Sequence, residues 1–367
     1  RRPRMSKAAE LAALIGSQTA LSNRNLIING AMQVAQRGTS ETGITGSEYA
    51  NAPDRFKAQI TTAGTWTLSQ SSTAPDGFAN SYKWDCTTAD ASLAAGDVIQ
   101  FAHKVEAQNL QQLQYGTSGA QAVTVSFYVR SNKTGTYILE IYQDDGARGI
   151  SKSYTIDSAD TWERKTITIP GDSSGSINDD NGIGFDMLWY LAAGTNFTSG
   201  TLATDWASLT SANRAVGQVN LADSTSNEWY ITGIQLELGE QETPFEHRSY
   251  GDELLRCQRY FEGGTRANSS HTGSAGLIWT QKNDSSSRTF PQMNAEYKVL
   301  KRATPTVTIE SGQDGTANRI SGYSSGINYT VTAIQSPSPS YVCSYIQTTG
   351  SLPDQITTGY YTADAEL

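Results

Sequence analysis

Two segments of the chain fit the Gly-x-Ser-x-Gly pattern of a serine nucleophile, GDSSG at 171–175 and GYSSG at 322–326. The pattern activates a serine only where a strand, a sharp turn and a helix follow one another and a histidine lies within reach. No helical pattern follows the first segment, and His103, His247 and His271 have no neighbours that indicate a partner base. Because a chain with 33 glycines produces such matches by composition, we assign no catalytic residue and predict a protein that is not an enzyme.

Neighbouring carboxylates occur at Asp144 with Asp145 and at Asp179 with Asp180. Glycoside hydrolysis uses paired carboxylates, but both pairs lie in turn-like segments, where Asp commonly stabilises the turn itself. The second pair belongs to NDDNG at 178–182, whose oxygen side chains suit calcium, although the bidentate Glu that completes a calcium loop is missing. We interpret both pairs as turns, and the metal content of the chain is unknown at this point.

No cofactor is indicated by the other chemistry-bearing residues. Cys86, Cys257 and Cys343 lack the short spacing of a zinc site and the even count of a disulfide framework. Gly182 and Gly184 lack the third glycine of a dinucleotide fingerprint. The sequence therefore predicts isolated thiols and no cofactor.

The charge balance argues against two classes of partner. Lys and Arg total 27 against 36 Asp and Glu, a net charge of −9, which does not suit a duplex nucleic acid or an anionic membrane surface. No apolar run approaches the length of a membrane span. We therefore predict a soluble protein, made in a reducing cytoplasm, that binds no nucleic acid and inserts into no membrane.

Composition and patterning predict an all-β protein. Of the 367 residues 37% are hydrophobic and 17% charged, and the small polar remainder suits short strands joined by turns. In the clearest strand Val123, Val125, Phe127 and Val129 alternate with polar residues, as in a half-buried antiparallel strand. Strands are predicted at 65–71, 81–86, 97–105, 122–131, 136–143, 162–170 and 185–193, and with a first and a last strand they make the inventory of a jelly roll.

The segment at 228–261 predicts the last strand, a turn and a short helix. Ile234, Leu236 and Leu238 alternate with Gln235 and Glu237, so we expect one face of this strand to meet the core and the other to meet water.

Ser249 is predicted to cap the helix that follows, with Asp252 as its reciprocal partner. The apolar side chains of this helix form one stripe at helical spacing, Tyr250, Leu254, Cys257 and Phe261. Because so short a helix is not stable alone, the stripe must dock on the sandwich, on the module that follows, or on other copies of the chain.

A second amphipathic helix is predicted at 6–16, with Leu11, Leu14 and Ile15 on one side. A chain end frays unless it is docked, so this helix packs either on its own sandwich or on another protein. After Gly263 a smaller β module is predicted, with strands at 276–282, 288–299, 304–311, 327–335 and 341–349.

Several motifs, in order, resemble those of bacteriophage tail-fibre and virion appendage proteins with a carbohydrate-binding-module-like jelly roll. The opening NLIINGAMQVAQRG matches their NLIINGxxxVxQRG, and IQLELG, TPFE, YGDELLRCQRYF, PTVT and the terminal ADAEL follow in the same order. Met32 and Phe56 stand where the family usually has an aromatic residue and Trp, and an insertion at 294–301 leaves the register of the last module open.

The resemblance implies four parts and a function. The parts are an anchor peptide at 1–24, a jelly-roll sandwich at 25–248, a connecting helix at 249–262 and a β module at 263–367. In such sandwiches the opening NLIING segment lies beside the last strand, and calcium is found near this turn. The implied protein is a homotrimeric tail fibre or head appendage on the phage virion, anchored to other virion proteins through Leu11, Leu14 and Ile15 and attached to host glycans. A capsid decoration protein without a ligand and a virion-borne glycan hydrolase are the alternatives.

Aromatic residues give the first candidates for glycan contact. The chain has 18 Tyr, 9 Phe and 7 Trp, and Tyr and Trp combine an apolar face with a polar tip. Four Trp lie in strand patterns and are predicted to be core residues, Trp66, Trp84, Trp189 and Trp229. The candidate glycan-contacting residues are the tyrosines of the last module, Tyr323, Tyr329, Tyr341, Tyr345, Tyr360 and Tyr361.

Overall fold

The computed structural model describes residues 24–263, 277–280, 296–311, 316–322, 328–335, 337–342, 345–348 and 356–367. The chain divides into two compact units, Arg1–Arg248 and Ser249–Leu367, and each is described by itself. The predicted anchor residues Leu11, Leu14 and Ile15 lie outside the described residues.

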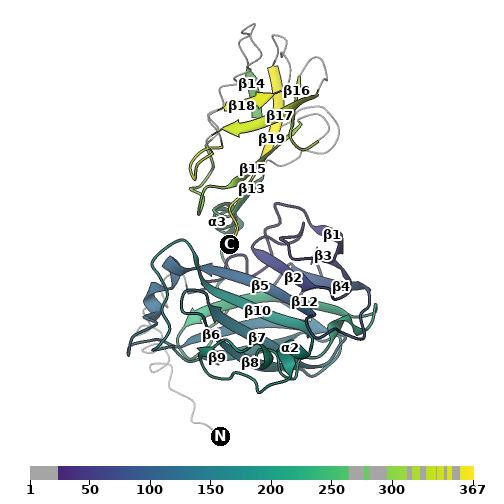
Figure 1. The fold of residues 1–367 in the computed structure, drawn as a ribbon, viewed down its shortest axis with the longest axis vertical. Coiled ribbons are helices and arrows are strands. Elements are labelled where there is room, and N and C mark those ends of the chain that lie inside the picture. The colour runs from purple at the N-terminus through teal and green to yellow at the C-terminus, as the bar shows by residue number, and fades with distance from the viewer. Residues whose placement is uncertain are drawn as a thin grey trace. The chain divides into compact units, whose positions relative to one another are not determined.

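The first unit is a sandwich of two antiparallel sheets, each with six strands (Figure 1). Sheet I contains, in spatial order, β1 (Ser40–Ile44), β3 (Thr65–Ser71), β4 (Ser81–Thr88), β12 (Glu228–Leu238), β6 (Val123–Ser131) and β9 (Glu163–Ile169). Sheet II contains β11 (Ala207–Ser208), β8 (Arg148–Ile156), β7 (Gly135–Gln143), β10 (Ile183–Ala193), β5 (Val98–Glu106) and β2 (Phe56–Thr61). The prediction of an all-β jelly-roll sandwich is confirmed.

Short helical turns connect these strands. They are η2 (Ala107–Leu113), α2 (Thr195–Thr198), η3 (Ser211–Asn213) and η4 (Leu221–Asp223). In the part of the chain that the structure describes, no helix is both long and apolar enough to cross a membrane.

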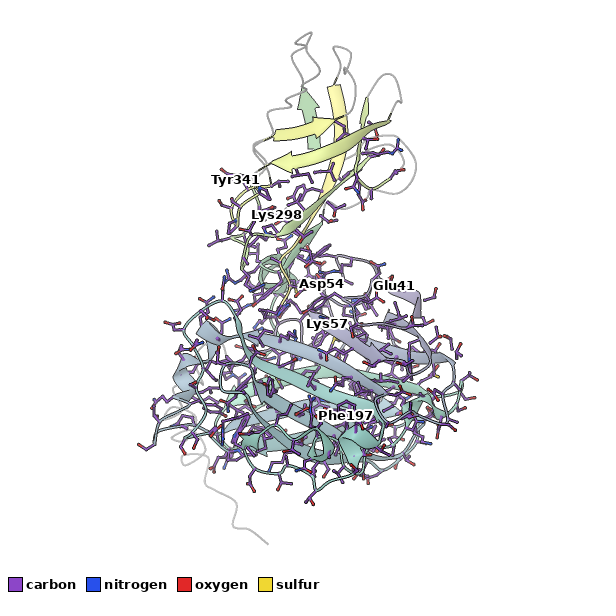
Figure 2. All side chains as sticks on the ribbon, in the orientation of Figure 1. Glu41, Asp54, Lys57, Phe197, Lys298 and Tyr341 are labelled. Carbon is purple, nitrogen blue, oxygen red and sulfur yellow. The ribbon has the colours of Figure 1, made fainter. Side chains whose placement is uncertain are left out.

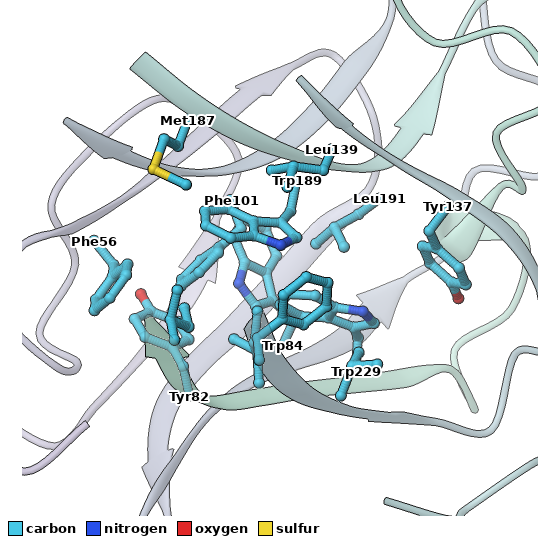
Figure 3. Packing of buried hydrophobic residues seen from close by; sticks show 14 of the residues in the cluster. Phe56, Tyr82, Trp84, Phe101, Tyr137, Leu139, Met187, Trp189, Leu191 and Trp229 are labelled. Atoms are coloured by element: carbon cyan, nitrogen blue, oxygen red, sulfur yellow. The ribbon is translucent and has the colours of Figure 1, made fainter. Parts of the chain in front are cut away.

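Aromatic side chains from both sheets fill the core of the sandwich (Figure 3). The four strand tryptophans, Trp66, Trp84, Trp189 and Trp229, are fully buried, which confirms their prediction as packing residues. The ring of Phe101 lies 5.7 Å from that of Trp189 and 5.6 Å from that of Trp229, so one sheet II side chain contacts rings from both sheets. Each such buried side chain contributes about 1.5–3 kcal/mol to folding.

The last strand of the sandwich, β12, differs from its prediction on one face. Ile234 and Leu236 are buried in the core as expected, but Gln235 and Glu237, expected to meet water, are only 0% and 2% exposed. The cause is the following segment, 239–248, which folds back over the outer face of sheet I. The backbone N–H of Thr243 donates to Glu237 Oε1 over 2.8 Å, and this segment thereby replaces water as the hydrogen-bond partner of the strand.

The opening segment NLIING lies beside β12, as the resemblance implied. The backbone N–H of Leu26 donates to the carbonyl of Leu236 over 2.9 Å, and that of Ile234 donates to the carbonyl of Gly30 over 3.0 Å. Residue 30 has to be glycine, because a Cβ there would lie 2.1 Å from the carbonyl oxygen of Ile234. Residues more than two hundred positions apart therefore share one edge of the core.

The second unit begins with helix α3 (Tyr250–Gln258). Its predicted cap is confirmed, because the backbone N–H of Asp252 donates to Ser249 Oγ over 3.2 Å and this hydroxyl in turn donates to Asp252 Oδ2 over 2.7 Å. Sheet III follows, with β13 (Phe261–Gly263), β14 (Leu277–Thr280), β15 (Thr306–Ser311), β16 (Arg319–Gly322), β17 (Asn328–Gln335), β18 (Tyr345–Thr348) and β19 (Ile356–Asp364).

The base of sheet III contains a buried ion pair. The Nζ of Lys301 lies 2.6 Å from Glu262 Oε2, and the two side chains are 0% and 2% exposed. The hydroxyl of Tyr361 donates to the other oxygen of Glu262 over 2.6 Å. These groups join α3, β13 and β19, which the sequence pattern does not reveal as neighbours.

Candidate functional site

The first serine motif is a structural loop. At 171–175 the carboxylate of Asp172 accepts hydrogen bonds from Arg148 over 2.6 Å and from Gln143 over 2.8 Å, and the backbone N–H of Ser174 donates to it over 3.0 Å. Residues 176–182 contain no helix. The first motif therefore lacks the strand–turn–helix geometry of a nucleophile, and most of the second, at 323–326, lies outside the described residues.

The paired carboxylates are turn residues, as predicted. Asp145 accepts a hydrogen bond from the backbone N–H of Asn178 over 2.9 Å, and Asp180 accepts one from Gly182 over 2.8 Å. No group of three or more His, Cys, Asp or Glu that could hold a metal is found among the described residues. Of the described cysteines, Cys86 and Cys257 are buried and form no disulfide.

The tyrosines predicted to contact a glycan have different surroundings. Tyr360 and Tyr361 are only 9% and 8% exposed, and the hydroxyl of Tyr361 is bonded to Glu262, so neither presents a free ring. Tyr341 is 36% exposed. Tyr323 lies outside the described residues. For Tyr329 on β17 and Tyr345 on β18 the structure describes the backbone only.

The stripe predicted to line an oligomer interface is divided by the fold. Cys257 is fully buried and Phe261 is 7% exposed, so both already pack inside the second unit. Leu254 is half-buried, and Tyr250 is 57% exposed. Only the first half of the stripe is available for contact with another molecule.

The outer face of sheet II brings together polar side chains that no sequence pattern groups. Lys104 on β5 lies opposite Asp186 on β10, and Asp186 lies opposite Tyr142 on β7. Lys57 on β2 lies opposite Ala102 on β5, and Ala102 lies opposite Leu188 on β10. Since alternate residues of a strand share a face, all of these side chains point outward from the same side of the sheet. We call Lys57, Lys104, Tyr142 and Asp186 the Asp186 cluster.

The side chains of the Asp186 cluster make no hydrogen bond or ion pair within the described part of the chain. Among the described residues, no hydrogen bond or ion pair involves the side chains of Lys57, Lys104 or Tyr142, although Lys57 Nζ lies 5.4 Å from the ring centre of Tyr49. The Oδ1 atom of Asp186 is buried and likewise has no hydrogen-bond partner in this part of the chain. Buried polar atoms normally have partners, so an unpaired carboxylate oxygen at this position is unusual.

Burial also perturbs the charge of Asp186. Desolvation raises its pKa to about 6, with Glu140 as a second cause in the same direction, whereas Lys104, Arg214 and Lys57 lower it. The carboxyl therefore changes its protonation near neutral pH, which is a property common at functional sites.

The segment at 194–220 covers one end of this face, where it contributes to the burial of the Glu140 carboxylate. Arg214 Nε donates to both oxygens of Glu140, over 3.0 and 2.9 Å, and the hydroxyl of Tyr190 donates to Glu140 over 2.8 Å. Phe197 of α2 packs over the same end, and Figure 2 labels it and Lys57 apart from each other on this side of the molecule. Because Glu140 is only 1% exposed, it cannot activate water beside Asp186.

On the outer face of sheet I, the polar side chains considered next have hydrogen-bond or ion-pair partners within the chain. The 239–248 segment covers Gln235 and Glu237, and the exposed cations beside it are paired. Lys83 lies 2.7 Å from Glu228, Arg130 lies 2.9 Å from Asp160, and Arg164 lies 3.0 Å from Glu242.

No known family model matches the chain, and no curated protein matches it. Solved structures with a similar strand arrangement include a tailspike protein domain of bacteriophage CBA120, a putative sugar-binding protein from Bacteroides thetaiotaomicron and a xylan-binding domain from Paenibacillus barcinonensis. Their identities to this chain are 11%, 14% and 18%, with TM-scores of 0.30, 0.31 and 0.27. The similarity covers 58%, 59% and 50% of this chain and 21%, 100% and 91% of the other chains. The chain thus spans about a fifth of the tailspike protein.

Proposed function

We propose that the first unit is a glycan-binding module whose ligand lies on the outer face of sheet II. The observation that carries this proposal is the Asp186 cluster, in which hydrogen-bonding side chains from four strands share one face and make no hydrogen bond or ion pair within the described part of the chain. A sugar presents many hydroxyl groups on an otherwise compact ring, so its recognition needs several such groups at once.

Each part of the face has a suitable role. The carboxylate of Asp186 accepts hydrogen bonds from sugar hydroxyls, and Lys57 and Lys104 donate to ring or hydroxyl oxygens. The half-buried ring of Tyr142 supplies an apolar surface with a polar tip, the combination that packs on the C–H groups of a sugar.

The test is a titration of the full chain against a panel of host-surface polysaccharides, followed by the Tyr142→Ala variant. Loss of one ring contact of about 1–2 kcal/mol predicts about tenfold weaker binding. Tyr128→Ala is the matched control, because Tyr128 is also a half-buried strand tyrosine but lies on the outer face of sheet I. Equal loss of affinity in both variants, or none in Tyr142→Ala, would overturn the placement of the site.

We further propose that this module serves a phage virion, as a tail fibre or a head appendage that attaches to host glycans. The ordered motifs from NLIING to ADAEL support this role. Incubation with host polysaccharide separates the alternatives: chain shortening would favour a hydrolase, and no binding at all would favour a decoration protein. Imaging of virions labelled on this protein would place it on tail or capsid.

The proposal includes a homotrimer formed through the second unit. Of the large apolar side chains that are exposed among the described residues, Tyr250, Leu255, Leu300 and Tyr341 lie in the second unit and only Leu209 in the first. Arg259, one helical turn after Leu255, donates to the carbonyl of Leu300, which brings the two leucines to the same side of α3. Identical copies related by closed symmetry would cover this surface without leaving an open interface.

A further inference from the structure

We propose that the outer face of sheet II selects anionic glycans, with Lys57 and Lys104 contacting a carboxylate of the sugar. This inference rests on the proposed glycan-binding function and adds the chemical class of the ligand. Its basis is the way in which the lysines of the sandwich are paired.

Six lysines lie in the described part of the first unit, and four of them have a partner. Lys83 pairs with Glu228, Lys133 with Asp223 and Lys165 with Glu163, and Lys152 donates to the carbonyl of Thr204 over 2.6 Å. The two without a hydrogen bond or ion pair among the described residues are Lys57 and Lys104.

These two lysines are also neighbours. Lys57 lies opposite Ala102, and Lys104 is two residues further along the same strand, so both ammonium groups extend from one face. Burial lowers the pKa of Lys104, Asp186 and Asp144 oppose this effect, and the charges of Lys57 and Arg55 lower the pKa further. Asp186 compensates this repulsion only in part, and an anion bound beside both ammonium groups would offset the remainder.

The rest of the molecule makes this pair distinctive. With a net charge of −9 the protein repels polyanions in general. A local pair of lysines without a hydrogen bond or ion pair therefore differs from the average surface of the chain. The opposing charges at this face are the carboxylates of Asp186 and Asp144, and Glu140 nearby is already balanced by Arg214. The face thus combines two positive charges with hydroxyl-binding groups, the requirement for an acidic sugar rather than for a neutral one.

Asp186 makes this selection dependent on pH. It is surrounded by Lys104 on β5, Lys57 on β2, Tyr142 on β7 and Arg214 with Glu140 at the covered end. When Asp186 is protonated the two lysines act on the ligand without an opposing charge, so binding of an anionic glycan strengthens as the pH falls below about 6.

The experiment compares polygalacturonate, which carries a carboxylate on each sugar, with its fully methyl-esterified form, which carries none. We expect the wild-type chain to bind polygalacturonate at least about tenfold more tightly, with an affinity that falls as salt is added. The double variant Lys57→Gln/Lys104→Gln is expected to lose this preference. Its matched control is Lys83→Gln/Lys165→Gln, which changes the net charge equally on sheet I.

The pH arm uses Asp186→Asn at about pH 5 and about pH 8, a range in which the galacturonate carboxylate stays ionised. The affinity of the wild-type chain for polygalacturonate should be several-fold higher at about pH 5 than at about pH 8. The Asp186→Asn variant should bind at both pH values with the affinity that the wild-type chain has at about pH 5. Thermal melts of each variant check that the fold is kept.

Three results would overturn the proposal: equal or tighter wild-type binding to the neutral polymer, no binding to polygalacturonate, or equal losses in the sheet I control and the sheet II double variant. Failure of the glycan-binding function itself looks different, because Tyr142→Ala would then leave binding to every polysaccharide unchanged. If Tyr142→Ala weakens binding while the lysine variant does not, the face binds glycans but does not select anionic ones.

Discussion

Asp186 occupies a position at which burial opposes its charge and no described hydrogen bond compensates for it. Such a residue lowers the stability of the folded protein at neutral pH, because the carboxylate must be desolvated on folding. Residues that reduce stability in this way are common at sites of function, where a ligand supplies the missing interaction.

The first prediction is that Asp186→Asn stabilises the free protein at neutral pH. Because burial raises the pKa of Asp186 from 3.8 to about 6, the folded state binds its proton more tightly than the unfolded state does. Ionisation of Asp186 therefore does not reduce the free energy of unfolding below about pH 4, and the reduction grows between about pH 4 and 6. Above about pH 6 it reaches its full value of about 3 kcal/mol. Denaturant unfolding at a series of pH values measures it.

The exposed residue Asp205 gives the control, since Asp205→Asn should leave stability unchanged at every pH. A stability gain for Asp186→Asn that is the same at low and neutral pH would show that the effect is not one of ionisation.

At the scale of elements, the 239–248 segment explains why several motifs occur together. Gln235 and Glu237 of IQLELG bind the backbone of Thr243 and Glu246 in TPFE, with the N–H of Glu246 donating to Gln235 Oε1 over 2.8 Å. The carboxylate of Glu246 then accepts the backbone N–H of Asn25 over 2.9 Å, at the start of NLIING. The motifs lie far apart in sequence, but they form one hydrogen-bonded layer at β12 of sheet I.

The second prediction concerns the closest contact in this layer. Gly30→Ala places a Cβ 2.1 Å from the carbonyl oxygen of Ile234, so the opening segment has to move away from β12. We expect a loss of about 3 kcal/mol or more in the free energy of unfolding. Gly46→Ala is the control, because nothing lies within 4 Å of a Cβ there. Similar stabilities for the two variants would mean that the NLIING contact contributes little.

For the whole molecule, the third prediction is a trimer that depends on the exposed apolar surface of the second unit. Leu255 is 47% and Leu300 62% exposed, so Leu255→Asp/Leu300→Asp removes apolar contact without disturbing the core. Sedimentation should show a wild-type trimer and a folded, monomeric variant. Phe261→Asp does not serve this test, because Phe261 is buried and its loss would unfold the unit.

Leu209→Asp is the matched control, an exposed leucine of the first unit that is 39% exposed. It should remain trimeric. A monomeric wild-type chain, or a double variant with wild-type mass, contradicts the proposed interface.

The fourth prediction concerns attachment to the virion. Deletion of residues 1–20, which include Leu11, Leu14 and Ile15, should leave a folded protein that keeps its glycan affinity but no longer joins particles. The described sandwich begins after this segment, so its strands are retained in the deletion. Particle incorporation, measured by immunoblot of purified virions, decides it, and normal incorporation would end the anchor hypothesis.

The sequence by itself determined the class of fold and most of the strands. β3 has the predicted bounds, Thr65–Ser71, and β6 and β10 agree within about two residues, because alternation between apolar and polar side chains is a local property of a strand. The buried tryptophans followed from the same alternation. The strands β1, β2, β8 and β11 were missed, and in β8 the residues Gly149, Ser151 and Lys152 weaken the apolar pattern.

Only the tertiary structure decided which faces meet water and which residues meet one another. Gln235 and Glu237 read as solvent-facing by alternation, yet they are buried because a segment that follows them in the chain folds back over the strand. Likewise, Lys57, Lys104, Tyr142 and Asp186 come from four strands whose spatial order, β7-β10-β5-β2, differs from their order in the chain. Side-chain periodicity reports how one strand relates to its own two faces, whereas the pairing of distant strands depends on the packing of the whole sandwich.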